Sequence, residues 1–164
     1  MMRFSWVLVA FWPGALAAQS VEVSTLSPEA AAMVPGVEAC LATADRLACA
    51  GVAIPACLEV STGGAEVTDV DRFQCVVHEP SLWEAVITAQ VEALHAVPTA
   101  QQPANLDEHP YDLAAEMVRD YAGALCAAAI YVFPDRREAA MRNRECMRDV
   151  YALHATTLAG FLDG

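Results

Sequence analysis

Residues 57–90 read CLEVSTGGAEVTDVDRFQCVVHEPSLWEAVITAQ, and the second half of this stretch decides the fold. It contains side chains at four-residue steps, a spacing that stacks them near one face of a helix: Cys75, Glu79, Trp83 and Ile87. Ser81 and Glu84 have the S-x-x-E spacing of a capping box, and Pro80 comes just before them. The pattern predicts a helix that begins or restarts near Ser81 and runs through Leu94.

The first 18 residues have the features of an export signal. Arg3 is their only charge, residues 6–12 form an apolar core, and residues 15–17 (Ala-Leu-Ala) form a small-x-small cleavage site. The apolar run is too short for a membrane span, which needs about 20 residues. We therefore expect a periplasmic or secreted mature chain without a membrane span, in which residues 19–36 are a flexible lead-in and residues 37–164 form one domain.

The chain is strongly acidic, with a formal net charge of −12. Removing the signal removes Arg3, one of nine cationic residues, against 21 acidic ones, and leaves a charge of −13. This balance argues against binding to nucleic acid or to anionic membrane surfaces, because both attract lysine and arginine. It fits a basic partner protein, and it fits plain solubility equally well.

Six cysteines remain in the mature chain, and an even number in an exported protein predicts disulfides. The alternative is a metal site, but no C-x-x-C spacing occurs. The four histidines are also scattered along the chain, at His78, His95, His109 and His154. We therefore expect no metal and no cofactor. Cys49 and Cys57 are expected on one helix, about 12 Å apart, too far to pair. Antiparallel helical hairpins instead predict Cys57–Cys75 and Cys126–Cys146, which leaves Cys40–Cys49.

The rest of the chain predicts further helices and no strand. They comprise a short helix from Ser27 that ends at Pro35-Gly36, then 37–44, 46–60 with Pro55 expected to kink or split it, a helix capped by Asp112 that stops at Pro134, and a last helix opened by Asp135 and Glu138. Residues 61–64 form a turn, and residues 98–111 form a loop rich in proline. The fold class expected is all-α, a small disulfide-stapled helical bundle.

Periodicity also predicts which faces of the last two helices are buried. For the helix after Asp112 the expected core positions are Met117, Tyr121, Leu125, Ala128 and Val132. For the last helix they are Met147, Val150, Tyr151, Leu158 and Phe161. The five arginines between residues 136 and 148 are expected on a solvated face.

No motif for nucleophilic catalysis or phosphate binding is present, so no catalytic residue is assigned. His78 and Glu79 could form an acid–base pair, because histidine titrates near neutral pH. The favoured interpretation is that Glu79 is structural and accepts hydrogen bonds from an arginine or a backbone amide. Trp83 is interpreted as a core residue, because its neighbours at helical spacing are apolar.

The sequence around the second half of the opening stretch resembles the LprI-type lysozyme-inhibitor family. Cys75, Glu79, Trp83 and Glu84 match its C-x-x-x-E-x-x-x-W-[DE] motif, and the resemblance extends over residues 40–160 through the cysteine framework: Cys40, Cys49, Gly51, Cys57, Cys126 and Cys146. It departs where other residues are usual in the family: Ile87, Thr88, Val118, Ala122 and His154.

The resemblance implies a secreted or periplasmic protein that inhibits a lysozyme-type hydrolase by steric binding, without catalytic residues of its own. A cell-envelope structural or interaction protein with another partner is the alternative. An enzyme is the third class, and no motif favours it.

Overall fold

The computed structural model describes residues 21–43, 48–96 and 109–163, and within these ranges it is helical without a strand. The 3₁₀ turn η1 (Val23–Thr25) precedes the helices, which are α1 (Pro28–Leu41), α2 (Ile54–Thr62), α3 (Asp69–Ala96), α4 (Pro110–Cys126), α5 (Ala129–Val132) and α6 (Arg136–Leu162). The expected export signal and most of the expected loop at 98–111 lie outside the described residues. None of the described helices is long and apolar enough to cross a membrane.

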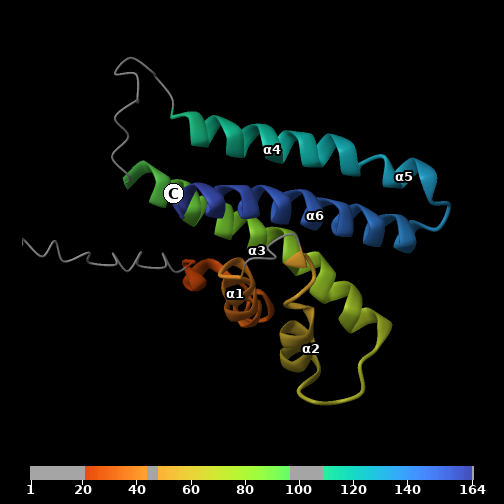
Figure 1. Ribbon diagram of the computed structural model, residues 1–164. Coiled ribbons are helices and arrows are strands. Elements are labelled where there is room, and N and C mark those ends of the chain that lie inside the picture. Colours follow the sequence, from red (N-terminus) through yellow and green to blue (C-terminus); the bar gives the residue numbers. More distant parts are fainter. Residues whose placement is uncertain (1–20, 44–47, 97–108, 164) are drawn as a thin grey trace, which may run out of the picture.

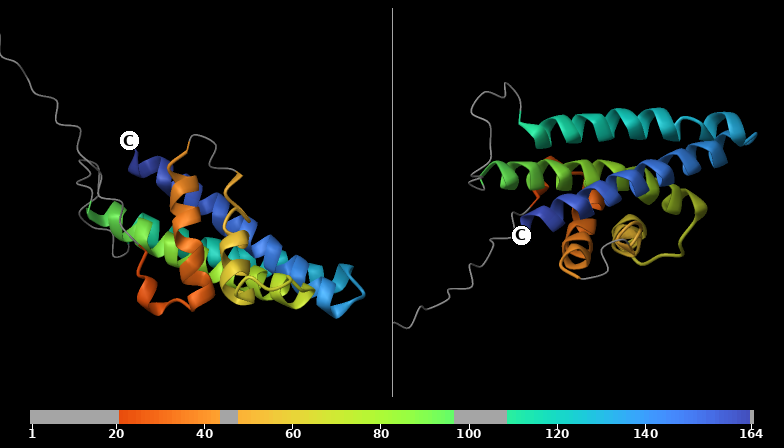
Figure 2. Two further views of the ribbon diagram at one scale, coloured as in Figure 1. Left: turned by 90° about the horizontal axis from the view of Figure 1, so that it is seen from below. Right: turned by 45° about the horizontal axis from the view of Figure 1, so that its top comes forward.

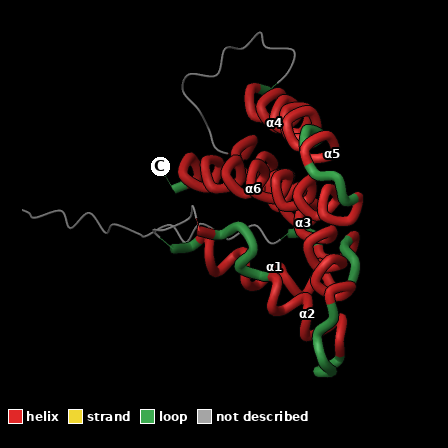
Figure 3. Tube along the Cα trace, turned by 90° about the vertical axis from the view of Figure 1, so that its right-hand side faces the viewer, coloured by secondary structure: helices red, strands yellow, loops and turns green. Residues whose placement is uncertain are grey.

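Two long helices, α3 and α6, cross at the centre and make the most extensive helix contact of the fold (Figure 1). Helices α4 and α5 cover one side of this pair, and α1 and α2 pack on the other, as the turned views also show (Figures 2 and 3). The molecule is therefore an all-α bundle in which the central pair is covered from both sides.

The core lies between α3, α6 and α1. Its largest fully buried side chains come from all three helices: Met33, Leu82, Trp83, Tyr151 and Leu158. Burying a side chain of this kind contributes about 1.5–3 kcal/mol. Of the core positions expected on the last helix, Tyr151 and Leu158 are buried, whereas Phe161 is 57% exposed and lies near the ring of Tyr111 at the surface.

Three disulfides tie the helices together, and they are the three pairs that hairpin geometry predicts: Cys40–Cys49, Cys57–Cys75 and Cys126–Cys146. The second joins α2 to α3, and the third joins α4 to α6. One step of the geometric reasoning was wrong, because Cys49 lies in a loop before α2 and not on a helix with Cys57. Pro55 lies in the first turn of α2, where its missing N–H costs no hydrogen bond. Of the expected kink or split, no kink is present, and the α-helix begins only at Ile54.

The expected break at Pro35-Gly36 is wrong, and so is a loose lead-in from residue 21 onward. Helix α1 continues through both residues, and Val21, Met33 and Val34 are buried. A Cβ on Gly36 would lie 3.4 Å from the Cβ of Ala53. An alanine at this position would therefore make only an ordinary contact with Ala53, and α1 packs here against the start of α2.

The expected helix start at Ser81 is also wrong, because α3 runs unbroken from Asp69 and includes a buried Pro80. The capping pair lies at Thr68 and Asp71 instead. The Thr68 amide donates to Asp71 Oδ2 over 2.9 Å, and the Asp71 amide donates to Thr68 Oγ1 over 3.3 Å. Burial of α3 against α6 outweighs the hydrogen bond that Pro80 cannot donate.

The caps of the last two long helices differ in how well the sequence predicts them. Asp135 caps α6 as expected, its Oδ1 accepting from the Glu138 amide over 2.8 Å. At α4, however, the capping residue is His109, whose Nδ1 accepts from the Tyr111 amide over 3.4 Å, and Asp112 lies in the first turn. Pro110 is the first residue of that helix, so the helix starts before Asp112.

Candidate functional site

The buried carboxylate of Glu79 is the most unusual polar group of the core. Its side chain is fully buried, and its Oε1 accepts from the Gly51 amide over 2.6 Å and from Trp83 Nε1 over 3.4 Å. Its Oε2 makes no hydrogen bond but lies 3.7 Å from Arg148 Nη1, within ion-pair distance. Glu79 thus connects the loop before α2 to α3 and α6.

Burial raises the pKa of Glu79, and this effect outweighs the Gly51 amide, the Arg148 guanidinium and the Trp83 indole, which lower it. His78 does not take part, because its Nδ1 lies 3.5 Å from Ser27 Oγ on a different side of α3. The acid–base pair is therefore not formed, and the interpretation of Glu79 as structural fits its partners.

Two further residues of the motif also serve packing. Trp83 is fully buried. Glu84 does not cap a helix, because its Oε1 accepts from the Tyr151 hydroxyl over 3.2 Å and pairs with Arg119 Nε at 3.5 Å. Burial, with Glu84 beside the hydroxyl, raises the pKa of Tyr151 to about 12, so Tyr151 stays a hydrogen-bond donor at neutral pH.

Arginines 136–148 are not all on a solvated face. Arg148 is only 18% exposed and pairs with both Glu79 and Asp149, whereas Arg142 pairs with Glu145 at 3.0 Å on the surface. Burial lowers the pKa of His154 on the same helix, and its Nε2 has no hydrogen-bond partner. These contacts hold the helices together and leave no catalytic arrangement among the motif residues in the described chain.

The main departure from the sequence prediction is the face of α4 and α5. The residues expected in the core are exposed: Met117 63%, Tyr121 58%, Leu125 46% and Val132 69%, with Ala128 exposed between them. The face turned toward α6 consists mainly of smaller or half-buried residues: Tyr111, Ala115, Val118, Ala122 and Cys126. Helix α4 is thus apolar on two sides, and the described residues cover only the side that faces α6.

We call Met117, Tyr121, Leu125 and Val132 the α4–α5 apolar face. Met117, Tyr121 and Leu125 follow one another at four-residue steps near one side of α4, and Val132 lies on the next helix, α5. Glu116 and Asp120 are exposed on the same helix. Several large apolar side chains exposed on one helix beside charged residues are typical of a protein interaction site.

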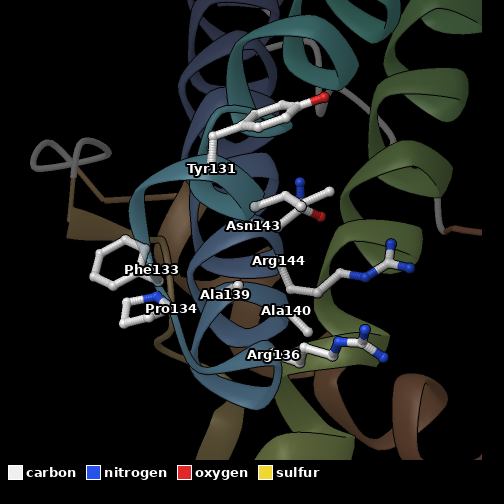
Figure 4. A pocket seen from close by; sticks show the side chains of 9 residues that line it. Tyr131, Phe133, Pro134, Arg136, Ala139, Ala140, Asn143 and Arg144 are labelled. Carbon is white, nitrogen blue, oxygen red and sulfur yellow. The ribbon is translucent and has the colours of Figure 1, made fainter.

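A cavity of about 600 Å³ lies beyond this face, where α5 turns into α6 (Figure 4). Figure 4 shows the Tyr131 hydroxyl and the guanidinium groups of Arg136 and Arg144 pointing to the same side of the hairpin, while Phe133 and Pro134 lie on the other. Asn143 also lines the cavity. Arginine, tyrosine and asparagine together offer hydrogen-bond donors suited to an anionic group.

The structure therefore brings the motif residues Cys75, Glu79, Trp83 and Glu84 together in or beside the core and places the exposed surfaces elsewhere. The α4–α5 apolar face was visible in the sequence as a periodic stripe, but its exposure was not. Comparisons of the chain with protein-family models, with curated proteins and with solved structures found no match.

Proposed function

We propose that the protein is a non-catalytic binding protein of the periplasm or the extracellular space. Its α4–α5 apolar face would dock on a basic hydrolase of the lysozyme type. The observation that carries the proposal is this exposed face on a helix whose opposite side already packs in the bundle. The resemblance of Cys75, Glu79, Trp83 and Glu84 to the LprI-type motif supports the class of partner. The disulfides fit an oxidising compartment.

The charges support a cationic partner. The chain has a formal net charge of −12, and Glu116 and Asp120 lie exposed on the helix that carries the apolar face. Such charges act mainly on the rate of association, while the buried apolar contacts determine how long the complex lasts. Steering should weaken as salt shortens the Debye length from about 10 Å at 0.1 M to about 3 Å at 1 M.

The test is a titration of c-type lysozyme activity with the mature protein at two salt concentrations. We expect inhibition that is slower to develop at high salt. Met117→Ser with Tyr121→Ser should weaken inhibition at least tenfold, since a central tyrosine that acts as a binding hot spot costs about 2 kcal/mol or more when truncated. The matched control is Val60→Ser with Val70→Ser, which removes two exposed apolar side chains from α2 and α3 and should leave inhibition unchanged.

Full lytic activity at a large molar excess of the protein, at both salts, would remove lysozyme as the target. Equal inhibition by the α4 variant and the control variant would remove the α4–α5 apolar face as the docking surface while leaving the target in place.

The alternative is a cell-envelope interaction protein with a different partner. The cavity lined by Arg136, Arg144 and Tyr131 favours it, because these donors suit an acidic group that a basic hydrolase would not supply. A pull-down from periplasmic extract with the wild type and with Arg136→Gln/Arg144→Gln would distinguish the two. The alternative is supported if the wild type captures a protein other than a lysozyme and the arginine variant does not capture it.

A further inference from the structure

The end of α3 and the start of α4 bring together two histidines and an aspartate that are separate in the sequence. His95 is in the last turn of α3, His109 precedes α4, and Asp112 lies in its first turn. One ligand atom from each lies within 4.8 Å of the other two. His95 Nε2 is 3.1 Å from Asp112 Oδ2, and the two imidazole rings have their centroids 4.2 Å apart.

We propose that His95, His109 and Asp112 bind a divalent transition-metal ion, with Zn²⁺ as the best fit. Two imidazoles and one carboxylate are donors that suit zinc and its neighbours, whereas magnesium and calcium prefer oxygen ligands. Three protein ligands would leave a fourth tetrahedral position open, as in zinc sites that bind water or a small ligand.

The distances require a small adjustment that the side chains can make. Around a tetrahedral zinc ion with bonds of about 2.0–2.1 Å, ligand atoms lie about 3.4 Å apart. The side chains of His95 and Asp112 are 39% and 42% exposed, so little packing opposes a rotation of either one. The separation of at most 4.8 Å can therefore close without moving the helices.

His109 already has a defined orientation, because its Nδ1 accepts from the Tyr111 amide. In the neutral ring this places the proton on Nε2, so a metal ion must either take Nδ1 in place of the amide or cause the ring to exchange its tautomer. The hydrogen bond is long, at 3.4 Å, and its loss costs correspondingly little.

The surroundings also favour a cation with a free coordination position. His95 and Asp112 line a cavity of about 540 Å³ whose wall includes Glu92, Glu116 and Arg119. The two glutamates add negative potential that raises the local concentration of cations.

The experiment is equilibrium dialysis and calorimetry of metal-free full-length mature protein with Zn²⁺. We expect one ion per chain at the highest-affinity site, and an affinity at least tenfold lower in each of His95→Gln, His109→Asn and Asp112→Asn. Asparagine at residue 109 can still cap α4, so a loss in that variant reports the ligand and not the cap. His78→Gln is the control and should bind as the wild type does.

Cobalt provides a second readout, because a tetrahedral Co²⁺ site absorbs visible light strongly and a loosely held hydrated ion does not. The wild type should show this absorption, and the triple variant of residues 95, 109 and 112 should not. Zinc binding of equal strength by wild type and triple variant would mean that surface carboxylates hold the ion and would overturn the proposal. So would the absence of stoichiometric binding by the wild type.

Discussion

At the scale of single residues, the core contains a buried carboxyl group, Glu79, whose effect on the free energy of unfolding depends on pH. The pKa of Glu79 is raised by burial despite its three partners, so the folded state holds a proton at this carboxyl more tightly than the unfolded state does. Its contribution to stability is therefore greatest below the ordinary glutamate pKa, which is about 4.3. The contribution falls as pH rises toward the folded-state value.

We therefore predict that Glu79→Gln changes how the Tm varies with pH more than it changes the Tm at any single pH. Glutamine retains an oxygen for the Gly51 amide, and Arg148 retains Asp149 at 2.7 Å. The Tm of the wild type minus that of the variant, measured by circular dichroism, should rise as pH is lowered from 7 toward 4.5. A difference that stays constant, or falls, would contradict a raised pKa.

The role of Glu79 was predictable in kind but not in detail. Its spacing to Cys75 and Trp83 places it on the packed side of α3, which is enough to predict a structural carboxylate. Its partners Gly51 and Arg148 come from distant parts of the chain, and helical periodicity has no information about such pairs. The same limit explains why Arg148 was expected in solvent.

At the scale of helices, the disulfide between α2 and α3 should matter most for stability. Cys57 and Cys75 are both fully buried, and chain entropy gives roughly 3 kcal/mol for a closed loop of this size. The sequence separation is 18 residues for Cys57–Cys75 and 20 for Cys126–Cys146, so the two bridges have nearly equal loop-closure entropies. Any difference in how much the two bridges stabilise the fold should therefore come from how deeply their cysteines are buried.

We predict that Cys57→Ala/Cys75→Ala lowers the free energy of unfolding more than Cys126→Ala/Cys146→Ala does. Removing the first pair leaves a void in the core and unties α2 from α3, whereas Cys146 is only partly buried. Urea denaturation of both double variants measures this, with the wild type in the same buffer. Equal midpoints would show that loop entropy alone accounts for both bridges.

Helix boundaries were less predictable than helix existence. Pro35 and Pro80 were expected to break helices, but tertiary packing of α1 and α3 outweighs the local cost of each proline. On α4, periodicity identified an apolar stripe correctly and assigned it to the wrong side. A stripe shows that a face is apolar, but only the fold shows what covers it, and here α6 packs on the other face around Ala122.

At the scale of the whole molecule, the three disulfides fit an oxidising compartment. We predict that the exported protein begins near Ala18 or Gln19, because residues 15–17 form the cleavage site. Intact mass spectrometry of the exported protein under non-reducing conditions measures both the start and the loss of six hydrogens on disulfide formation. A mass that includes Met1 would contradict cleavage.

The Cys126–Cys146 bridge has a consequence for how the sequence can diverge. It encloses α5 and the first turns of α6, where Ile130, Tyr131 and Val132 are largely exposed. Because the side chains of Ile130, Tyr131 and Val132 are exposed, they bury little apolar surface, and substitutions there should cost little of the folding free energy. Related chains should therefore vary faster here than around Trp83, and the hairpin is the place where a new binding preference could arise without loss of the fold.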